Sequence, residues 1–548
     1  MSTAFFEKSK EIANDYLQSI VFLDDKAFEA NIEQTNFHAF DSSEISKAFA
    51  KEKKICAVYK PSSESDIDDF KEISKKADVV ILDWLITLQD IMNEKDNIME
   101  DADAEDPRGE HTKKIIKELI EKSGNDSLKL IIIYTGEDIL EEITEDIFEE
   151  VSRYNQVFTL NNGNCEVSSA NIKILIRGKS GGNDEARFKQ RPHLLEKILS
   201  YDNLPSFILN EFTLMTSGLL SNFALLSLST IRKNSHKILS LFSKNSDPAY
   251  LSHKSLLPHS DDAEQILHHL LKDSIGDLLF YHNTGGILSV EMINDWIECY
   301  MKEENLPARN KKGTSFNPII SFKRDKELLN ALLFSEETNV EKKFQKIFKE
   351  IIPKEQLESF LLYLSNSSIM LFLNSENFEK ENDCNREFAK LTHHKSLFLP
   401  SNISPILTLG VIIKCSNNND YYICIQQKCD SVRIKKENDR KFLFLPLVKV
   451  NDNKFDLITF DGIKLKLDRK SFALKTMKFK CDSDKGVILG KQTTEGKYIF
   501  KNIYDEEFEW ILDLKDLHSQ RIATQYASEL SRVGLDESEW LRRASLDN

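Results

Sequence analysis

The chain of 548 residues is poor in glycine, proline and cysteine. It has 18 glycines and 12 prolines, which excludes collagen-like and other fibrous architectures. Its eight cysteines are scattered along a long sequence, so we expect reduced thiols rather than a disulfide framework. An excess of positive charge is also missing. The 73 basic and 89 acidic residues give a net charge of −16, which argues against a protein that binds polyanions over its whole surface.

The sequence shows neither a secretory signal nor a clean transmembrane segment. Residues 1–8 contain no basic region followed by an apolar run. The most apolar stretch, residues 207–231, is long enough to span a bilayer but contains Asn210, Glu211 and Asn222. Polar groups inside lipid are costly, so we expect a buried helix or one that pairs with another helix. The prediction is a cytoplasmic protein without membrane contact.

The first 180 residues alternate apolar runs of strand length with amphipathic helices. At roughly 150 residues per domain, the length indicates about three or four domains, and this alternation defines the first. Continuous apolar strands between helices predict a doubly wound α/β domain with a five-stranded parallel sheet, covered on both faces. The expected strand runs are 19–25, 55–59, 78–85, 128–134 and 171–179, and the expected helices are 4–18, 42–53, 65–77, 110–123 and 138–153.

The remaining two-thirds of the chain changes character twice. Residues 185–375 are mostly helical, and from about 385 the segments are short, β-branched or aromatic, up to a closing helix at 515–533. We therefore predict three domains: residues 1–200 (α/β), 201–380 (all-α) and 381–548 (β-rich with a terminal helix). The expected helical runs are 192–200, 206–242, 264–281, 289–303, 326–334, 342–350 and 355–373, and the expected strands are 406–414, 421–426, 431–434, 442–447, 455–459, 464–467 and 498–500.

Three acidic residues stand at the carboxyl ends of predicted strands. Asp24 and Asp25 follow the first strand, and Asp83 follows the third. In a sheet with the strand order 2-1-3-4-5, strands 1 and 3 are neighbours at the point where ligands bind. The three carboxylates therefore converge, and their mutual repulsion calls for a hard divalent cation such as Mg²⁺. Thr135 ends the fourth strand and Lys179 the fifth, so that a hydroxyl and a cation border the same edge, as suits a phosphoryl group on a carboxylate.

These residues resemble the receiver domain of bacterial response regulators, over roughly residues 15–200. The resemblance implies that Asp83 is the phosphoacceptor and that Asp24 and Asp25 are the acid pair that holds Mg²⁺. It further implies that the backbone carbonyl of Leu85 is the third protein ligand of the ion. A partner histidine kinase would supply the phosphoryl group.

The resemblance also assigns roles at the ends of the fourth and fifth strands. Thr135 matches the switch hydroxyl, and Lys179 matches the lysine that contacts the phosphoryl oxygens. The chain departs from the family at Ile176, where many members have a rotating aromatic residue, and at Ser180, where they have a proline. These departures put the usual switching mechanism in doubt more than phosphorylation itself.

The chain as a whole is similar to the large stand-alone receiver proteins of Detocs-type anti-phage two-component systems. That similarity implies a phosphate sink or regulator in anti-phage defence without an effector enzyme, and a response regulator or effector protein as a further partner. The oligomeric state stays open, with a dimer as one alternative. Two other hypotheses remain: a scaffold that is never phosphorylated, and a regulator whose basic β region binds nucleic acid.

The charges and cysteines of the sequence are unevenly placed. Residues 463–480 hold seven basic residues and one acid, which we interpret as a solubilising edge strand in preference to a nucleic-acid site. The four cysteines after residue 400 lack the paired spacing of zinc sites. Residues 89–110 carry a net charge of −7 and residues 137–150 one of −8, so most of the negative charge lies near the predicted phosphoacceptor and suits a basic partner.

Overall fold

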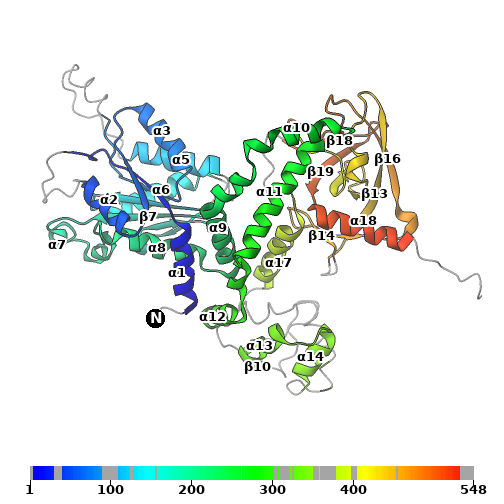
Figure 1. Cartoon of the computed structure of the whole chain (residues 1–548). Helices are drawn as coiled ribbons and strands as arrows, with labels where there is room; N and C mark the ends of the chain where they lie inside the picture. Colours follow the sequence, from blue (N-terminus) through cyan, green and yellow to red (C-terminus); the bar gives the residue numbers. More distant parts are fainter. Residues whose placement is uncertain are drawn as a thin grey trace, which may run out of the picture. The chain divides into compact units, whose positions relative to one another are not determined.

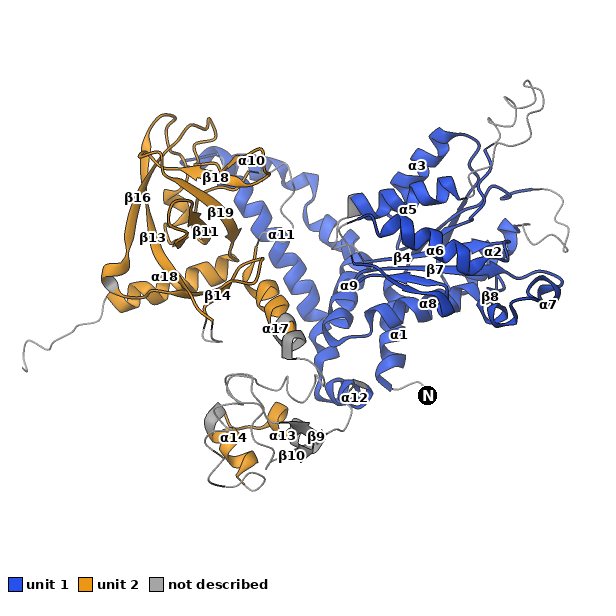
Figure 2. Cartoon of the chain, turned by 180° about the vertical axis from the view of Figure 1, so that it is seen from behind, with its two compact units in different colours: residues 1–301 blue, residues 302–548 orange. Residues whose placement is uncertain are grey.

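The computed structural model, drawn in Figure 1, describes most of the chain. The described residues are 4–29, 40–88, 109–123, 128–154, 157–260, 262–300, 305–307, 321–323, 326–349, 354, 357, 378–395, 404–451 and 455–530. Residues 1–301 form one compact unit and residues 302–548 a second (Figure 2). The domain boundaries at residues 200 and 380 stay predictions.

An eight-stranded sheet forms the centre of the first unit. Its strand order is β2-β1-β3-β4-β7-β6-β5, and β8 pairs with β7 beside this path. β2, β1, β3, β4 and β7 pair in parallel, and β5 and β6 continue the sheet in antiparallel fashion. The strands are β1 (Ser19–Leu23), β2 (Ile55–Tyr59), β3 (Val79–Leu82), β4 (Lys129–Thr135), β5 (Thr159–Asn161), β6 (Glu166–Ser168), β7 (Ile172–Lys179) and β8 (Ile198–Leu199).

Helices pack on both faces of this sheet, as the continuous apolar strands require. β3 and β4 are buried along their whole length, and alternate residues of each strand enter separate hydrophobic cores on the two faces. One face is covered by α3 (Glu64–Ser74), α5 (Glu110–Ser123) and α6 (Leu140–Val151). The other is covered by α1 (Ala4–Tyr16), α2 (Ser42–Lys51), α8 (Leu204–Thr216) and the first half of α9 (Leu219–Leu241).

The count of five strands is wrong. The five predicted strands are present and lie in the predicted order, but β5, β6 and β8 enlarge the sheet. These three strands have two or three residues each, too few for a period-two pattern to be recognised. A helix was predicted at 192–200. The chain there forms a short 3₁₀ helix, Pro192–Lys197, and then β8.

The apolar stretch after residue 206 forms two helices rather than one. α8 ends at Thr216 and α9 begins after Gly218. Two polar side chains of this stretch have partners inside the protein: Asn222 Nδ2 donates a hydrogen bond of 2.8 Å to Ser9 Oγ in α1, and Glu211 accepts one of 2.7 Å from Lys173. No helix in the described part of the chain combines the length and the apolar character needed to cross a membrane.

The region predicted to be all-α is mostly helical but also contains two strands. β9 (Asn305–Pro307) and β10 (Ser321–Lys323) pair in antiparallel fashion, so the all-α prediction is wrong there. The helix predicted at 355–373 lies outside the described residues except for residue 357. The helices here are α10 (Asp247–Leu256), α11 (Asp262–Tyr281), α12 (Val290–Tyr300), α13 (Lys326–Phe334), α14 (Val340–Phe348) and α17 (Phe378–His393).

The last part of the chain is β-rich and has a terminal helix, as predicted. A nine-stranded sheet has the order β14-β15-β13-β12-β11-β19-β18-β17, with β16 paired to β13, and separate hydrophobic clusters lie on its two faces. The strand predicted at 431–434 is absent, and β16, β17 and β19 were not predicted. The elements are β11 (Val411–Cys415), β12 (Tyr421–Cys424), β13 (Asp439–Lys449), β14 (Leu457–Ile458), β15 (Lys464–Leu467), β16 (Lys475–Lys480), β17 (Lys491–Gln492), β18 (Tyr498–Lys501), β19 (Glu507–Asp513) and α18 (Asp516–Leu530).

Candidate functional site

Asp24, Asp25 and Asp83 meet at the carboxyl edge of the parallel sheet. The Asp83 amide donates a hydrogen bond of 2.9 Å to the Leu23 carbonyl. This bond extends the pairing of β1 with β3 by one residue and fixes the position of the Asp83 backbone. Each of the three aspartates offers a carboxylate oxygen within 4.8 Å of the other two. Asp24 is 0 % and Asp83 2 % exposed. The predicted convergence of residues nearly sixty positions apart is therefore present in the structure.

Lys179 connects two of these carboxylates. It stands at the end of β7, on the far side of β4 from β3, and its side chain is 2 % exposed. Its Nζ donates to Asp24 Oδ2 at 2.6 Å and to Asp83 Oδ2 at 2.9 Å. Burial by itself lowers the pKa of Lys179, but the charges of Asp24 and Asp83 outweigh it and raise the pKa. The lysine is therefore a fixed cation.

The charges at this edge do not balance. Three buried carboxylates face one buried ammonium group, so the fully ionised cluster carries a net charge of −2. Burial is the main reason why the pKa of Asp83 is raised, to about 7; Lys179 opposes the shift and Asp24 adds to it. Burial also raises the pKa of Asp25, against the opposing charge of Lys26. A divalent ion with oxygen ligands fits this donor set, because it would neutralise the excess charge.

Thr135 and Leu85 lie at the positions that the sequence predicts. Thr135 ends β4 opposite Gly178 of β7, is fully buried, and accepts a hydrogen bond of 3.1 Å from the Glu137 amide through Oγ1. Leu85 comes two residues after Asp83 and is half-buried. The roles of the Thr135 hydroxyl and of the Leu85 carbonyl stay predictions.

Sequence reasoning missed a set of residues that hold the end of β3. Thr112, in the first turn of α5, donates through Oγ1 to the Asp83 carbonyl at 2.6 Å and is fully buried. Trp84, also buried, packs over Gly109, where a Cβ would come within 2.3 Å of the indole ring. Gly109 has φ +77°, a conformation that favours glycine. The first turn of α5 and the glycine before it thus hold Asp83 and Trp84 in place.

Arg187 joins the ends of β4 and β7. It belongs to α7 (Asp184–Arg187), and its guanidinium donates to the carbonyls of Lys179 at 2.8 Å, Thr135 at 3.5 Å and Glu137. The two predicted residues Thr135 and Lys179 therefore share one backbone clamp. Arg187 follows Lys179 by only eight positions, but no motif in the sequence marks it as a partner of these carbonyls.

Aromatic side chains surround Lys179 on its other side. Lys179 Nζ lies 5.6 Å from the ring centroid of Phe40. Tyr201 lies against both Phe40 and Tyr134, with ring centroids 6.0 and 6.2 Å apart. Ile176, at the position where the family often has a rotating aromatic, is fully buried in the core on the opposite face. The aromatic groups near this site therefore come from other positions than in the family pattern.

The site thus has a central carboxylate with two further acids and a lysine around it. Comparison with protein families supplies an independent finding. Residues 16–184 match the response receiver domain. The matched part is less than a third of the chain. No curated protein and no solved structure matches the chain. The receiver domain supports a phosphoacceptor signalling protein of the response-regulator type.

The acidic surface near the receiver site is only partly described. The residues 89–108 lie outside the described part of the chain. In α6, the acids Glu142, Glu145, Asp146 and Glu149 are exposed, so this helix presents a negatively charged outer face. Among the described residues, Asp24, Asp25 and Asp83 are the only group of three or more His, Cys, Asp or Glu side chains close enough to hold a metal ion.

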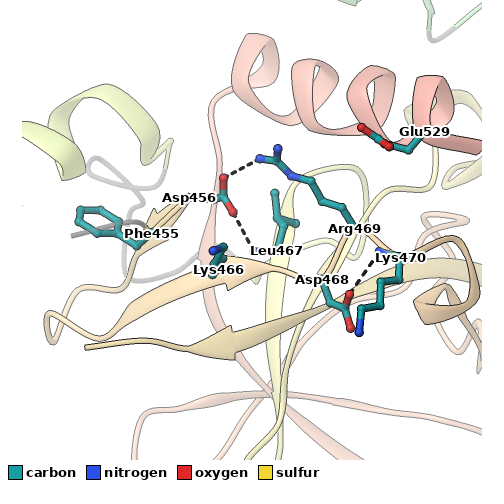
Figure 3. A pocket seen from close by; sticks show the side chains of 8 residues that line it. All are labelled: Phe455, Asp456, Lys466, Leu467, Asp468, Arg469, Lys470 and Glu529. Carbon is teal, nitrogen blue, oxygen red and sulfur yellow. Dashed lines mark hydrogen bonds and ion pairs between the residues drawn. The ribbon is translucent and has the colours of Figure 1, made fainter. Parts of the chain in front are cut away.

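The basic stretch 463–480 forms an open pocket of about 740 Å³ together with α18 (Figure 3). The exposed Lys466 alternates with buried leucines in β15, as predicted. Arg469 pairs with Asp456 at 2.6 Å, and the Lys470 amide donates to Asp468 at 3.2 Å. The lining comprises three basic and three acidic residues, so its charges cancel: Lys466, Arg469, Lys470, Asp456, Asp468 and Glu529. The prediction that this stretch does not bind nucleic acid stays a prediction.

Proposed function

We propose that the protein is a cytoplasmic signalling protein that accepts a phosphoryl group on Asp83 from the phosphohistidine of a partner histidine kinase. The observation that carries the proposal is the bridge from Lys179 Nζ to Asp24 and Asp83, at 2.6 and 2.9 Å, inside a receiver domain. A lysine fixed beside a carboxylate at the edge of a sheet supplies positive charge where the oxygens of a transferred phosphoryl group come to lie.

The residues of this chain suit an in-line transfer. A carboxylate oxygen of Asp83 attacks phosphorus, the bond from phosphorus to the histidine nitrogen breaks, and the histidine leaves as a neutral ring after taking up a proton. Oδ1 accepts the Trp84 amide at 2.8 Å, which orients the carboxylate during the attack. Lys179 Nζ then contacts a phosphoryl oxygen, and the Thr135 hydroxyl donates to another.

Asp24, Asp25, Asp83 and the Leu85 carbonyl would hold Mg²⁺ in this site. When bound, the ion supplies charge neutralisation between the carboxylates and the phosphoryl oxygens. Water later hydrolyses the acyl phosphate and restores Asp83. We assign no enzymatic activity beyond this transfer and its reversal by water. On the likeness to Detocs-type proteins, the role is a phosphate sink or regulator in anti-phage defence, with a response regulator or effector protein as a further partner.

Phosphorylation of the full chain tests this function. The protein is incubated with Mg²⁺ and acetyl phosphate, or with a phosphorylated histidine kinase, and its intact mass is measured. We expect one added phosphoryl group, lost in Asp83→Asn and in the presence of a chelator. Asp78→Asn is the matched control. Asp78 is a half-buried aspartate directly before β3, at the other end of the strand from Asp83, and it accepts hydrogen bonds from the Gln18 and Ser19 amides.

Two results would contradict the proposal. An unmodified wild-type chain under all these conditions would indicate a scaffold that acts without phosphorylation. A phosphoryl group that persists in Asp83→Asn would place the acceptor elsewhere. Circular dichroism must show that the wild type is folded in the first case and that Asp83→Asn is folded in the second.

A further inference from the structure

A helical arm in the first unit exposes an apolar surface. The arm comprises residues 235–260 and 262–281, that is, the end of α9, α10 and α11, drawn in green in Figure 1. α11 packs against both α9 and α10, so the three helices form one surface. Among the described residues of the arm, Ala263 alone is buried. Helices of 10 and 20 residues obtain most of their stability from packing, and here nearly all of their side chains face solvent.

Many of the exposed side chains of the arm are large and apolar, of the kind that is usually buried in a protein core. Eleven of the thirty exposed large hydrophobic residues of the described chain belong to it. In α11, Leu267, Leu270 and Leu271 are 36 to 50 % exposed, and Phe280 is 78 % exposed. Exposed apolar side chains gathered on packed helices in this way are typical of interaction surfaces.

We propose that this arm is the surface on which a second copy of the chain docks. An apolar face needs an apolar partner. Only nine exposed large hydrophobic residues are described in residues 302–548, and they are spread from α17 to the end of α18. Among the described residues, the surface with a comparable density of exposed apolar side chains is the arm itself. Two arms related by a twofold axis cover each other with the same residues, as in most homodimers.

The charges of the arm favour the same partner. Lys237 and Lys244 lie at and just beyond the end of α9, and Asp273 and Asp277 lie in the second half of α11, which has a net charge of −1. Within the described residues, none of these four side chains has an ion-pair partner. In a twofold pair, the basic end of one α9 meets the acidic half of the partner's α11, and the contact occurs twice. Opposite charges at the rim then fix the orientation of the apolar faces.

Pairing of the arms would place two receiver domains at a set distance. α9 is continuous from the arm into the receiver core, where Leu225 packs against the sheet. The arm is therefore a rigid extension of the receiver. The proposal does not depend on phosphorylation of Asp83.

Sedimentation equilibrium of the full chain over a range of concentrations tests the proposal. We expect a monomer–dimer equilibrium, with a dissociation constant raised at least about 100-fold in the double variant Leu267→Glu and Leu271→Glu, because charge in an apolar contact costs several kcal/mol. The matched control is Leu214→Glu and Leu517→Glu, two exposed leucines outside the arm that should leave the dimer unchanged. Circular dichroism checks that each variant is folded.

Charge reversal identifies the partner surfaces. Lys237→Glu alone and Asp277→Lys alone should each weaken the dimer about tenfold, and the double reversal should restore it. A chain that stays monomeric at all concentrations overturns the proposal, and so does a dimer that ignores the leucine substitutions. Failure of the double reversal to restore the dimer overturns the twofold pairing of α9 with α11.

Discussion

Removal of the Lys179 charge is the sharpest perturbation of the receiver site. Lys179→Met keeps the length of the side chain and leaves Asp24 and Asp83 without their cation. At an effective dielectric constant of ~20, ion pairs at 2.6 and 2.9 Å are worth about 6 kcal/mol each before desolvation. Desolvation of the buried ammonium group cancels most of this sum, and loss of one partner of a buried pair typically costs about 3–5 kcal/mol. We expect a loss of this size in the absence of divalent ions.

Amide hydrogen exchange in the presence of a chelator measures this loss locally. Amides in peptides from β1, β3 and β4 should exchange faster in Lys179→Met than in the wild type, because the free energy of opening falls by about 3–5 kcal/mol. Lys173→Met is the matched control. Lys173 lies on the same strand β7 and pairs with Glu166 at 3.3 Å and Glu211 at 2.7 Å, but at the opposite end of the strand. Its loss should cost less, because the pairs are partly exposed to solvent.

Divalent ions should partly reverse the defect of Lys179→Met. The net charge of the ionised site changes from −2 to −3, so the attraction for Mg²⁺ rises. We expect calorimetry to show Mg²⁺ binding at least about tenfold tighter than in the wild type, and unchanged binding in Lys173→Met. Equal exchange rates of wild type and Lys179→Met in chelator, or weaker Mg²⁺ binding by the variant, would refute the electrostatic reasoning.

Three further predictions concern the clamp at β3 and the second unit. Thr112→Val leaves a buried carbonyl without its donor and should destabilise the first unit by about 1–3 kcal/mol in urea denaturation. Gly109→Ala forces a Cβ into Trp84 at a positive φ and should cost more than about 2 kcal/mol in the same assay. His393 and His518 stack at 4.1 Å, and burial lowers the pKa of both, that of His518 to about 4. The unfolded chain therefore binds more protons between pH 6.5 and 4, so the thermal stability of the second unit should fall as the pH falls through this window, and less so in His518→Gln.

Matched variants distinguish these effects from general damage. Thr112→Ser retains the hydroxyl and should stay close to the wild type. Gly163→Ala adds a Cβ that would meet only Asn161 Oδ1, at 3.8 Å, and Gly163 has no positive φ, so this substitution should be nearly neutral. His236→Gln, an exposed position on α9, should leave the pH dependence unchanged. A pH profile of His518→Gln identical to that of the wild type would show that the stacked pair does not contribute.

The carboxylate cluster was predictable because it depends on strands and not on side-chain detail. Long apolar runs identified β1, β3, β4 and β7, and the doubly wound order then brought Asp24, Asp83 and Lys179 to one edge. In the second unit, the hairpin of β11 and β12 was equally clear, since an Asn-rich turn separates two β-branched runs.

The residues that support the cluster were beyond sequence reasoning. Thr112 follows Asp83 by 29 positions, and nothing in the intervening chain indicates that α5 returns to the end of β3. Gly109 is one glycine among 18, and only its contact with Trp84 gives it a role. β16 and β19 were missed because lysine or glutamate residues stand between their apolar residues, so that each segment resembles a loop in composition.

The way in which α8 and α9 cover the sheet limits how the protein can be divided. The matched receiver segment ends at residue 184, yet Phe212 of α8 and Leu225 of α9 complete the core on one face. A fragment cut at residue 184 would lack these side chains, would expose part of this core to water, and should aggregate. For expression or domain transplantation, the smallest fragment that should fold extends to about residue 301. The end of the family match and the end of the folded unit therefore do not coincide.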